Sequence, residues 1–138
     1  MLETQLTASL ATLPSFIAFF AVGIAISLVF VAIYSAVTPH HEFALIRAGN
    51  ASAAIAFGGA LIGFELPLGS AVVHSLNLLD MVVWGVVALL VQLLAYLTAR
   101  LCDPRLSARI AGGDISAGIF VAIIALAVGI LNAACITY

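Results

Sequence analysis

Long apolar runs separated by short polar stretches dominate the pattern of this chain. Apolar and polar residues do not alternate within these runs, so they are unlike the strands of a membrane β-barrel. A helix that spans the hydrocarbon core needs about 20 predominantly apolar residues, and it pairs its backbone N–H and C=O groups internally. We therefore predict four membrane-spanning helices. Their predicted ranges are Pro14–Val37, Ala51–Val73, Met81–Leu101 and Ile115–Ile136.

The polar connections between these runs are short, and they read TPHHEFALIRAGN, HSLNLLD and CDPRLSARIAGGD. Short connections place each helix antiparallel beside its predecessor. The expected fold class is therefore all-α, an integral membrane four-helix bundle. In residues 1–13, before the first span, leucines recur at steps of four and three. An amphipathic helix on the outer surface of the membrane and a frayed terminus are the two interpretations of this segment.

The composition agrees with a membrane protein. Of the 138 residues, 65% are hydrophobic and 7% are charged, whereas soluble domains carry about 25% charged residues. The lipid bilayer is therefore an expected partner. The formal net charge is only −2 and the sequence has no basic patch with interleaved aromatic residues, so we expect no binding to nucleic acid. The two cysteines lack CxxC or Cys/His spacing, and we expect no metal and no cofactor.

The basic residues are all arginines, and they occur at two places. Arg47 is in the first connection, and Arg100, Arg105 and Arg109 are in or beside the third. Short loops that carry Lys or Arg face the cytoplasm, so we expect both connections there and both termini on the other side. The same four arginines are the surface on which a soluble cytoplasmic partner would dock.

The first and third connections resemble each other when the chain is shifted by 64 residues. ALIRAGNASAAI (44–55) and ARIAGGDISAGI (108–119) share six of twelve residues. The repeat predicts two tandem helical hairpins, residues 14–75 and 76–138, preceded by the segment 1–13. Because each unit contains two spans, both insert the same way round, and their pseudo-twofold axis runs along the membrane normal.

The repeated pairs Gly49-Asn50 and Gly113-Asp114 precede the second and fourth spans. Glycine permits the turn out of the connection, and Asn50 and Asp114 are expected to cap the next helix by accepting hydrogen bonds from its free N–H groups. Phosphate binding at these helix starts is the alternative interpretation.

Three stretches carry a resemblance to a known family: LIRAGNASAAIAFGGALIGFELPL, DMVVWGVVALLVQLL and GILNAACITY. They resemble the YjfL-type family of bacterial inner-membrane proteins, domain of unknown function number 350, which often occurs in two copies. The resemblance covers roughly Ser15 to Tyr138. It implies a multi-pass protein of the bacterial cytoplasmic membrane, which with the arginine pattern places both termini in the periplasm. It implies no activity and no catalytic residues.

Glu65 is the most costly residue inside a predicted span. It lies about 22 Å along the helix from Asn50, at about 1.5 Å per residue, and so in the outer half of a core about 30 Å thick. A charge near the membrane centre costs about 3 kcal/mol on insertion scales, and such residues usually mark a functional site. The alternative is a helix end, because Pro67 disrupts the helix and admits water to Glu65.

Small residues precede this carboxylate. Gly58, Gly59 and Gly63 form a surface that lets another helix approach closely, and a gating hinge is the alternative. Pro67 is expected to kink or end the helix.

Glu65, Gln92 and Asn132 form the predicted intramembrane polar site. Asn132 lies one helical turn beyond Gly129, which replaces Glu65 in the second repeat. The acid is therefore not needed to build the fold, which favours a functional Glu65. Gln92, together with Ser27, is also interpreted as an interhelical hydrogen-bonding residue.

His40, His41 and Glu42 are adjacent in the first connection. Neighbouring loop residues rarely converge on one ion without further ligands, so we predict a solvated loop and not a metal site.

Two functions fit these features. The first is a small homo-oligomeric channel or transporter-like protein in which Glu65 binds a cation or proton, beside a proline-broken helix of the kind that forms transporter sites. The second is a non-catalytic membrane scaffold or adaptor in envelope stress that docks a soluble cytoplasmic partner through its arginine-bearing loops. We do not expect an enzyme, because the sequence has no catalytic constellation.

Overall fold

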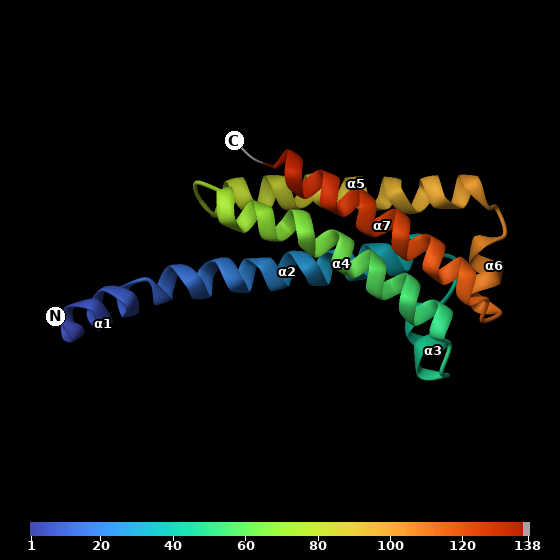
Figure 1. The fold of residues 1–138 in the computed structure, drawn as a ribbon, viewed down its shortest axis with the longest axis horizontal. Helices are drawn as coiled ribbons and strands as arrows, with labels where there is room; N and C mark the ends of the chain where they lie inside the picture. Colours follow the sequence, from blue (N-terminus) through green and yellow to red (C-terminus); the bar gives the residue numbers. More distant parts are fainter. Residues whose placement is uncertain (137–138) are drawn as a thin grey trace.

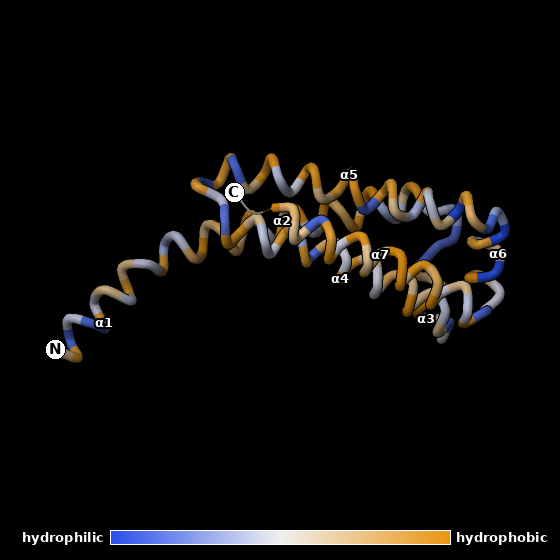
Figure 2. Tube along the Cα trace, turned by 45° about the horizontal axis from the view of Figure 1, so that its top comes forward, coloured by the Kyte–Doolittle hydropathy of each residue, from blue (hydrophilic) through white to orange (hydrophobic). Residues whose placement is uncertain are grey.

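The computed structural model describes residues 1–136, and within them it contains helices and no strands. The long helices are α2 (Leu13–Val37), α4 (Ala51–His74), α5 (Leu78–Cys102) and α7 (Ile115–Cys135), and the short ones are α1 (Leu2–Ala11), α3 (Glu42–Arg47) and α6 (Leu106–Ala111). The all-helical class is confirmed, and so are four helices long and apolar enough to cross a membrane. Figure 2 shows that their positions are mostly hydrophobic, and that hydrophilic positions gather around α6 and at the link between α4 and α5.

The ends of the long helices follow from local sequence. Pro14 is in the first turn of α2, where its missing N–H costs nothing and its φ already suits a helix. The helix α5 begins three residues before the predicted Met81, because the side chain of Asn77 accepts a hydrogen bond from the Asp80 N–H at 2.9 Å. This contact is a standard N-cap.

Helices α3 and α6 lie within the connections that were predicted as loops, and they begin 64 residues apart. Each ends in a glycine with positive φ, at 86° for Gly49 and 83° for Gly113, a conformation that favours glycine. The next backbone N–H returns to the helix, from Asn50 to Leu45 O and from Asp114 to Arg109 O, both at 2.9 Å. Both connections thus end in a Schellman motif. This agreement supports the tandem duplication, which stays a prediction.

The closest pair of helices is α4 and α7, which run side by side in the same direction (Figure 1). Gly59 lies against Ala122, Gly63 against Ala125, and Gly118 against Ser52, and a methyl group on any of these glycines would overlap the facing helix. Such contacts are those of small residues between membrane helices. The connection lengths predicted neighbours along the chain, whereas the tightest packing joins helices from different predicted repeats.

The packing role predicted for three glycines applies to Gly59 and Gly63 but not to Gly58. A methyl group on Gly58 would meet no atom within van der Waals reach. The reason is geometric, since neighbouring residues point about 100° apart around a helix of 3.6 residues per turn.

The helix α4 does not end at Pro67, as one interpretation of the sequence expected. It continues to His74, and Pro67 is buried inside it. Proline lacks the N–H that would pair with the carbonyl four residues back, which is that of Gly63. The side chain of Gln92 on α5 donates to this carbonyl at 2.9 Å. A neighbouring helix therefore satisfies the group that Pro67 leaves free, which is how membrane helices tolerate proline.

The helix α2 is the least buried of the four long helices. Of its residues only Phe30 and Tyr34 are buried. Phe30 stacks on Phe64 of α4 with ring centroids 4.2 Å apart, and Tyr34 meets Tyr96 of α5 edge-on at 5.6 Å. Nothing in α1 is buried, and α1 projects beyond the other helices (Figure 1). Residues 2–11 form a helix, and its place on the outer surface of the membrane stays a prediction.

The bundle has two distinct ends. The start of α1, the end of α7 and the link between α4 and α5 lie at one end, and α3 and α6 lie at the other, called here the α3/α6 end (Figure 1). This arrangement places all four arginines at or near the α3/α6 end, on Arg47 of α3, Arg100 near the end of α5, and Arg105 and Arg109 in and beside α6. Which end faces the cytoplasm stays a prediction.

Candidate functional site

A groove of about 700 Å³ runs between α2 and α4, and we call it the α2/α4 groove. Its walls are mainly apolar. The lining residues are Ser15, Phe16, Phe19, Phe20, Gly23, Ile24, Ser27, Leu28 and Val31 of α2 and Leu61, Glu65, Leu68, Gly69 and Val72 of α4. Glu65 is the one ionisable side chain among them. The fully buried residues of α2, Phe30 and Tyr34, lie in its second half, whereas most residues of its first half are exposed.

Glu65 is exposed in this groove and is held by Ser27 of α2. The Ser27 hydroxyl lies 2.6 Å from Glu65 Oε1 and 2.9 Å from the Gly23 carbonyl oxygen. A serine hydroxyl has one proton to donate and can also accept. It therefore suits both forms of the acid, donating to an ionised Glu65, or accepting from a protonated Glu65 while it donates to Gly23.

Gln92 lies in the core of the bundle, away from this groove. Its side chain is 1% exposed, and its Nε2 donates to Gly63 O of α4 at 2.9 Å and to Ala125 O of α7 at 3.0 Å. One amide thus joins three helices, which agrees with the interpretation of Gln92 as an interhelical hydrogen-bonding residue. A methyl group on Gly63 would lie 3.1 Å from Gln92 Nε2, so the Gln92 side chain packs against the contact between α4 and α7.

The three residues of the predicted intramembrane polar site do not meet. Gly63, which Gln92 contacts, and Glu65 are two residues apart and so point in nearly opposite directions, about 200° around the helix. Asn132 lies near the end of α7, and its Nδ2 is buried with no hydrogen-bond partner among the described residues. Ser27, by contrast, is the direct partner of Glu65.

A second polar cluster lies at the α3/α6 end, where the sequence predicted a solvated loop. That prediction is wrong for His40 and Glu42, which are 6% and 1% exposed, whereas His41 is exposed. Thr38 donates a short hydrogen bond to Glu42, and His40 Nδ1 lies 2.5 Å from Ser107 Oγ of α6. These residues are buried because α6 comes from the other half of the chain to cover them.

The buried histidine and glutamate of this cluster have Nε2 and Oε1 atoms 3.5 Å apart. Burial lowers the pKa of His40, and the neighbouring His41 lowers it further. Burial raises the pKa of Glu42, opposed by the hydrogen bond from Thr38. Both shifts favour the neutral form of each group, as expected where water is excluded.

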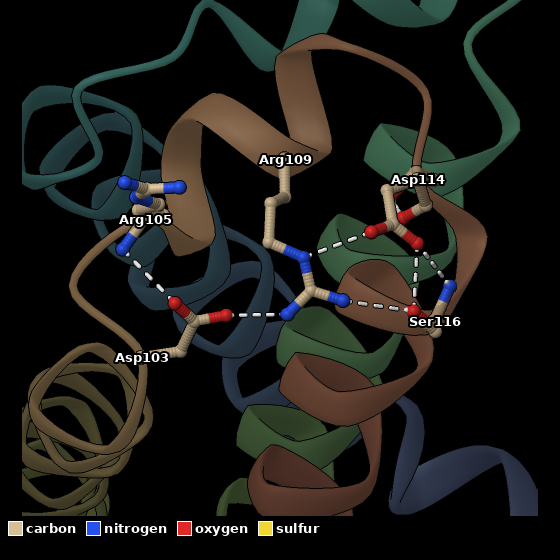
Figure 3. Close-up of polar contacts among 6 residues, drawn as sticks. Asp103, Arg105, Arg109, Asp114 and Ser116 are labelled. Atoms are coloured by element: carbon tan, nitrogen blue, oxygen red, sulfur yellow. Dashed lines mark hydrogen bonds and ion pairs between the residues drawn. The ribbon is translucent and has the colours of Figure 1, made fainter.

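The side chain of Arg109 on α6 is paired with neighbouring acidic and hydroxyl side chains of the same chain (Figure 3). Its guanidinium contacts Asp103, donates to Asp114 Oδ2 at 2.8 Å and donates to Ser116 Oγ at 2.9 Å. The hydrogen bond from Arg109 lowers the pKa of Asp103, and those from Ser116 and Arg109 lower the pKa of Asp114. The predicted docking surface of four arginines is therefore reduced, since Arg109 serves the fold. Arg47, Arg100 and Arg105 are exposed.

The helix starts of α4 and α7 are capped by the residues that the sequence indicated. Asn50 Oδ1 accepts from the Ala53 N–H at 3.0 Å, and Asp114 Oδ1 accepts from the Ser116 N–H at 3.1 Å. Asn50 also donates to Ile110 O at 2.8 Å, which ties the start of α4 to the end of α6. Both side chains are thus engaged within the fold.

Among residues 1–136 no group of three or more His, Cys, Asp or Glu side chains is arranged to hold a metal ion.

Comparison with known proteins gives the following matches. Residues 7–136 match the family described as Domain of Unknown Function (DUF350). The UPF0719 inner membrane protein YjfL of Escherichia coli (strain K12) is 43% identical over 129 residues, which are 94% of this chain and 98% of that relative. The UPF0719 transmembrane protein YshE of Bacillus subtilis (strain 168) is 26% identical over 88 residues, or 64% of this chain and 66% of that relative. No solved structure matches the chain.

Proposed function

The chain belongs to the family described as Domain of Unknown Function (DUF350), and from this premise we propose that it is a small homo-oligomeric channel or transporter-like protein of the bacterial inner membrane. In this proposal Glu65 is the intramembrane site for a cation or a proton. The name of the Escherichia coli relative supports the location, and four apolar helices support the membrane.

The observation that carries the proposal is the position of Glu65. Its carboxyl group is exposed in a groove whose other lining residues are uncharged, on a helix long and apolar enough to span the membrane. A charge facing lipid costs about 3 kcal/mol or more near the membrane centre. A bound cation or a bound proton removes this cost, and either one makes Glu65 a site.

The close packing of α4 on α7 supports a path along the outside of the single chain. Between α4 and α7 the backbones meet at glycine, and the Gln92 side chain of α5 is bonded to both helices. The α2/α4 groove is a large open space beside the carboxyl group of Glu65. A second copy placed across its mouth would separate Glu65 from lipid, which is why the proposal includes a homo-oligomer.

Flux measurements in reconstituted vesicles test this function. We expect the parent chain to conduct protons or monovalent cations, organic cations included, and Glu65→Gln to abolish that flux because the amide carries no negative charge and takes up no proton. The matched control is Glu3→Gln, which removes the same charge from exposed α1 and should leave the flux unchanged. Undiminished flux through Glu65→Gln, or none through the parent chain, contradicts the proposal.

A further inference from the structure

We propose that the α2/α4 groove binds a lipophilic organic cation, a monovalent ammonium or phosphonium that carries aromatic or alkyl groups. This inference rests on the proposed function, because it names the class of substrate for the site at Glu65. It uses three properties of the groove: its size, its lining and its single charge.

The size of the groove exceeds what an inorganic ion or a proton needs. Its volume is about 700 Å³, whereas a water molecule takes about 30 Å³ in the liquid. Sites for organic ligands range from about 300 to 1,000 Å³. The groove therefore matches an organic molecule of drug-like size.

The lining is unsuited to a bare metal ion. Hard cations such as Ca²⁺ take about six to eight oxygen ligands, but the polar side chains here are only Glu65, Ser27 and Ser15. An organic cation spreads its charge under apolar groups and requires no such shell. Phe16 and Phe20 stack with centroids 5.7 Å apart and planes inclined by 7°, and their faces and edges can contact such a cation.

The positive charge of the ligand is inferred from Glu65. It is the one ionisable side chain among the lining residues, and its carboxylate attracts a cation and repels an anion, with little screening in an apolar groove. Ser27 holds the carboxyl group from the α2 side at 2.6 Å, so a ligand that reaches Glu65 lies between both helices. A neutral apolar molecule would fill the same space without using this charge.

In the single chain, the groove is open to such a ligand from the membrane. The first half of α2 is largely exposed, including Phe16 and Phe20 on the groove side. A lipophilic cation partitions into the bilayer and can reach the groove sideways from lipid. A hydrated inorganic ion cannot use this route.

Binding of tetraphenylphosphonium to the full chain in phosphatidylcholine nanodiscs tests the inference. We expect saturable binding. Glu65→Gln should weaken it by about tenfold or more, a change of about 1.4 kcal/mol, and the double variant Phe16→Ala, Phe20→Ala should weaken it as well. Two control variants, Glu3→Gln and Ile130→Ala on the exposed face of α7, should bind as the parent does. Tetraphenylmethane, which has the same shape without charge, should not compete.

A second measurement uses the unaltered chain and so does not depend on how the variants fold. Dicyclohexylcarbodiimide modifies carboxyl groups in apolar sites, and tetraphenylphosphonium should protect Glu65 from it, as read by mass spectrometry. Unprotected modification, equal binding to Glu65→Gln, or equal competition by tetraphenylmethane overturns the inference. Binding without ion or proton flux would overturn the proposed function alone, and flux without binding would overturn this inference alone.

Discussion

At the scale of single residues, a glutamine on α5 supplies the hydrogen bond that a proline on α4 cannot donate. Pro67 frees the carbonyl of Gly63, and Gln92 donates to it at 2.9 Å. The sequence indicated both residues as special, but their relation depends on how α5 is rotated against α4. That rotation is set by tertiary packing and leaves no mark in either segment alone.

This relation predicts a coupled effect on stability. Gln92→Leu should destabilise the chain by about 1–3 kcal/mol, because it leaves a buried carbonyl without a partner. Pro67→Ala restores an N–H for that carbonyl, so in its presence Gln92→Leu should cost less. A double-mutant cycle of unfolding free energies in detergent micelles measures the coupling, and strictly additive effects would contradict the interpretation.

The buried pair His40 and Glu42 predicts a pH dependence with opposite signs for its two members. The folded pKa of His40 lies below its ordinary 6.5, so protons favour the unfolded chain and stability falls as pH drops through that value. The folded pKa of Glu42 lies above its ordinary 4.5, so its contribution is present below pH 4.5 and is lost as pH rises through the folded pKa.

His40→Asn separates the two contributions, since the amide can still bond Ser107 but does not titrate. Between pH 7 and pH 5 the variant should lose less thermal stability than the parent, as measured by melting temperature in detergent. His74→Asn is the matched control, because His74 is exposed at the end of α4, away from this pair. A variant whose melting temperature follows the parent's over this range would show that His40 carries none of the effect.

At the scale of elements, the contact of α4 with α7 is the central packing feature. The small residues in LIRAGNASAAIAFGGALIG predicted a close helix contact, and it occurs. The partner helix was not predictable from the glycines alone. Four of the eleven glycines lie against the backbone of the facing long helix and the others do not, and the sequence does not distinguish the two groups. Connection length argued for sequence neighbours, whereas close fit decided the pairing.

Substitution of these glycines should give contrasting results. Gly129→Ala places a methyl group against the backbone of Gly63 and should destabilise by about 1–3 kcal/mol through overpacking. Gly58→Ala meets no neighbour and should be neutral, or stabilising by up to about 1 kcal/mol through helix propensity. Unfolding free energies of the two variants are directly comparable, and equal values would rule out the close contact as the cause.

At the scale of the whole molecule, the helix ends and membrane class follow from hydropathy and turn chemistry, whereas the sites depend on contacts between distant segments. Ser27 and Glu65 are 38 residues apart, and His40 and Ser107 are 67 apart. Glu65 was recognised because a charge inside a span is costly. The His40 cluster was missed because its covering residue, Ser107, lies in the other half of the chain.

The arrangement also predicts an orientation. With Arg47, Arg100 and Arg105 exposed at the α3/α6 end, that end should face the cytoplasm. Alkaline phosphatase, active only in the periplasm, should therefore be active when fused to the C-terminus. The same reporter inserted after Arg47 should be silent, and the reverse result would invert the topology.

The aromatic contacts of α2 with the other long helices begin at Phe30, which stacks on Phe64 of α4, and continue at Tyr34. A tilt of α2 about Phe30 would move positions before it by distances that grow toward the start of the helix. At about 1.5 Å per residue, Ser27 lies about 4.5 Å from this point and Phe16 about 21 Å. A tilt about Phe30 therefore moves Phe16 roughly four to five times as far as Ser27, because displacement grows in proportion to the distance from the pivot. The mouth of the groove can thus widen by several ångströms while the hydroxyl stays within reach of Glu65.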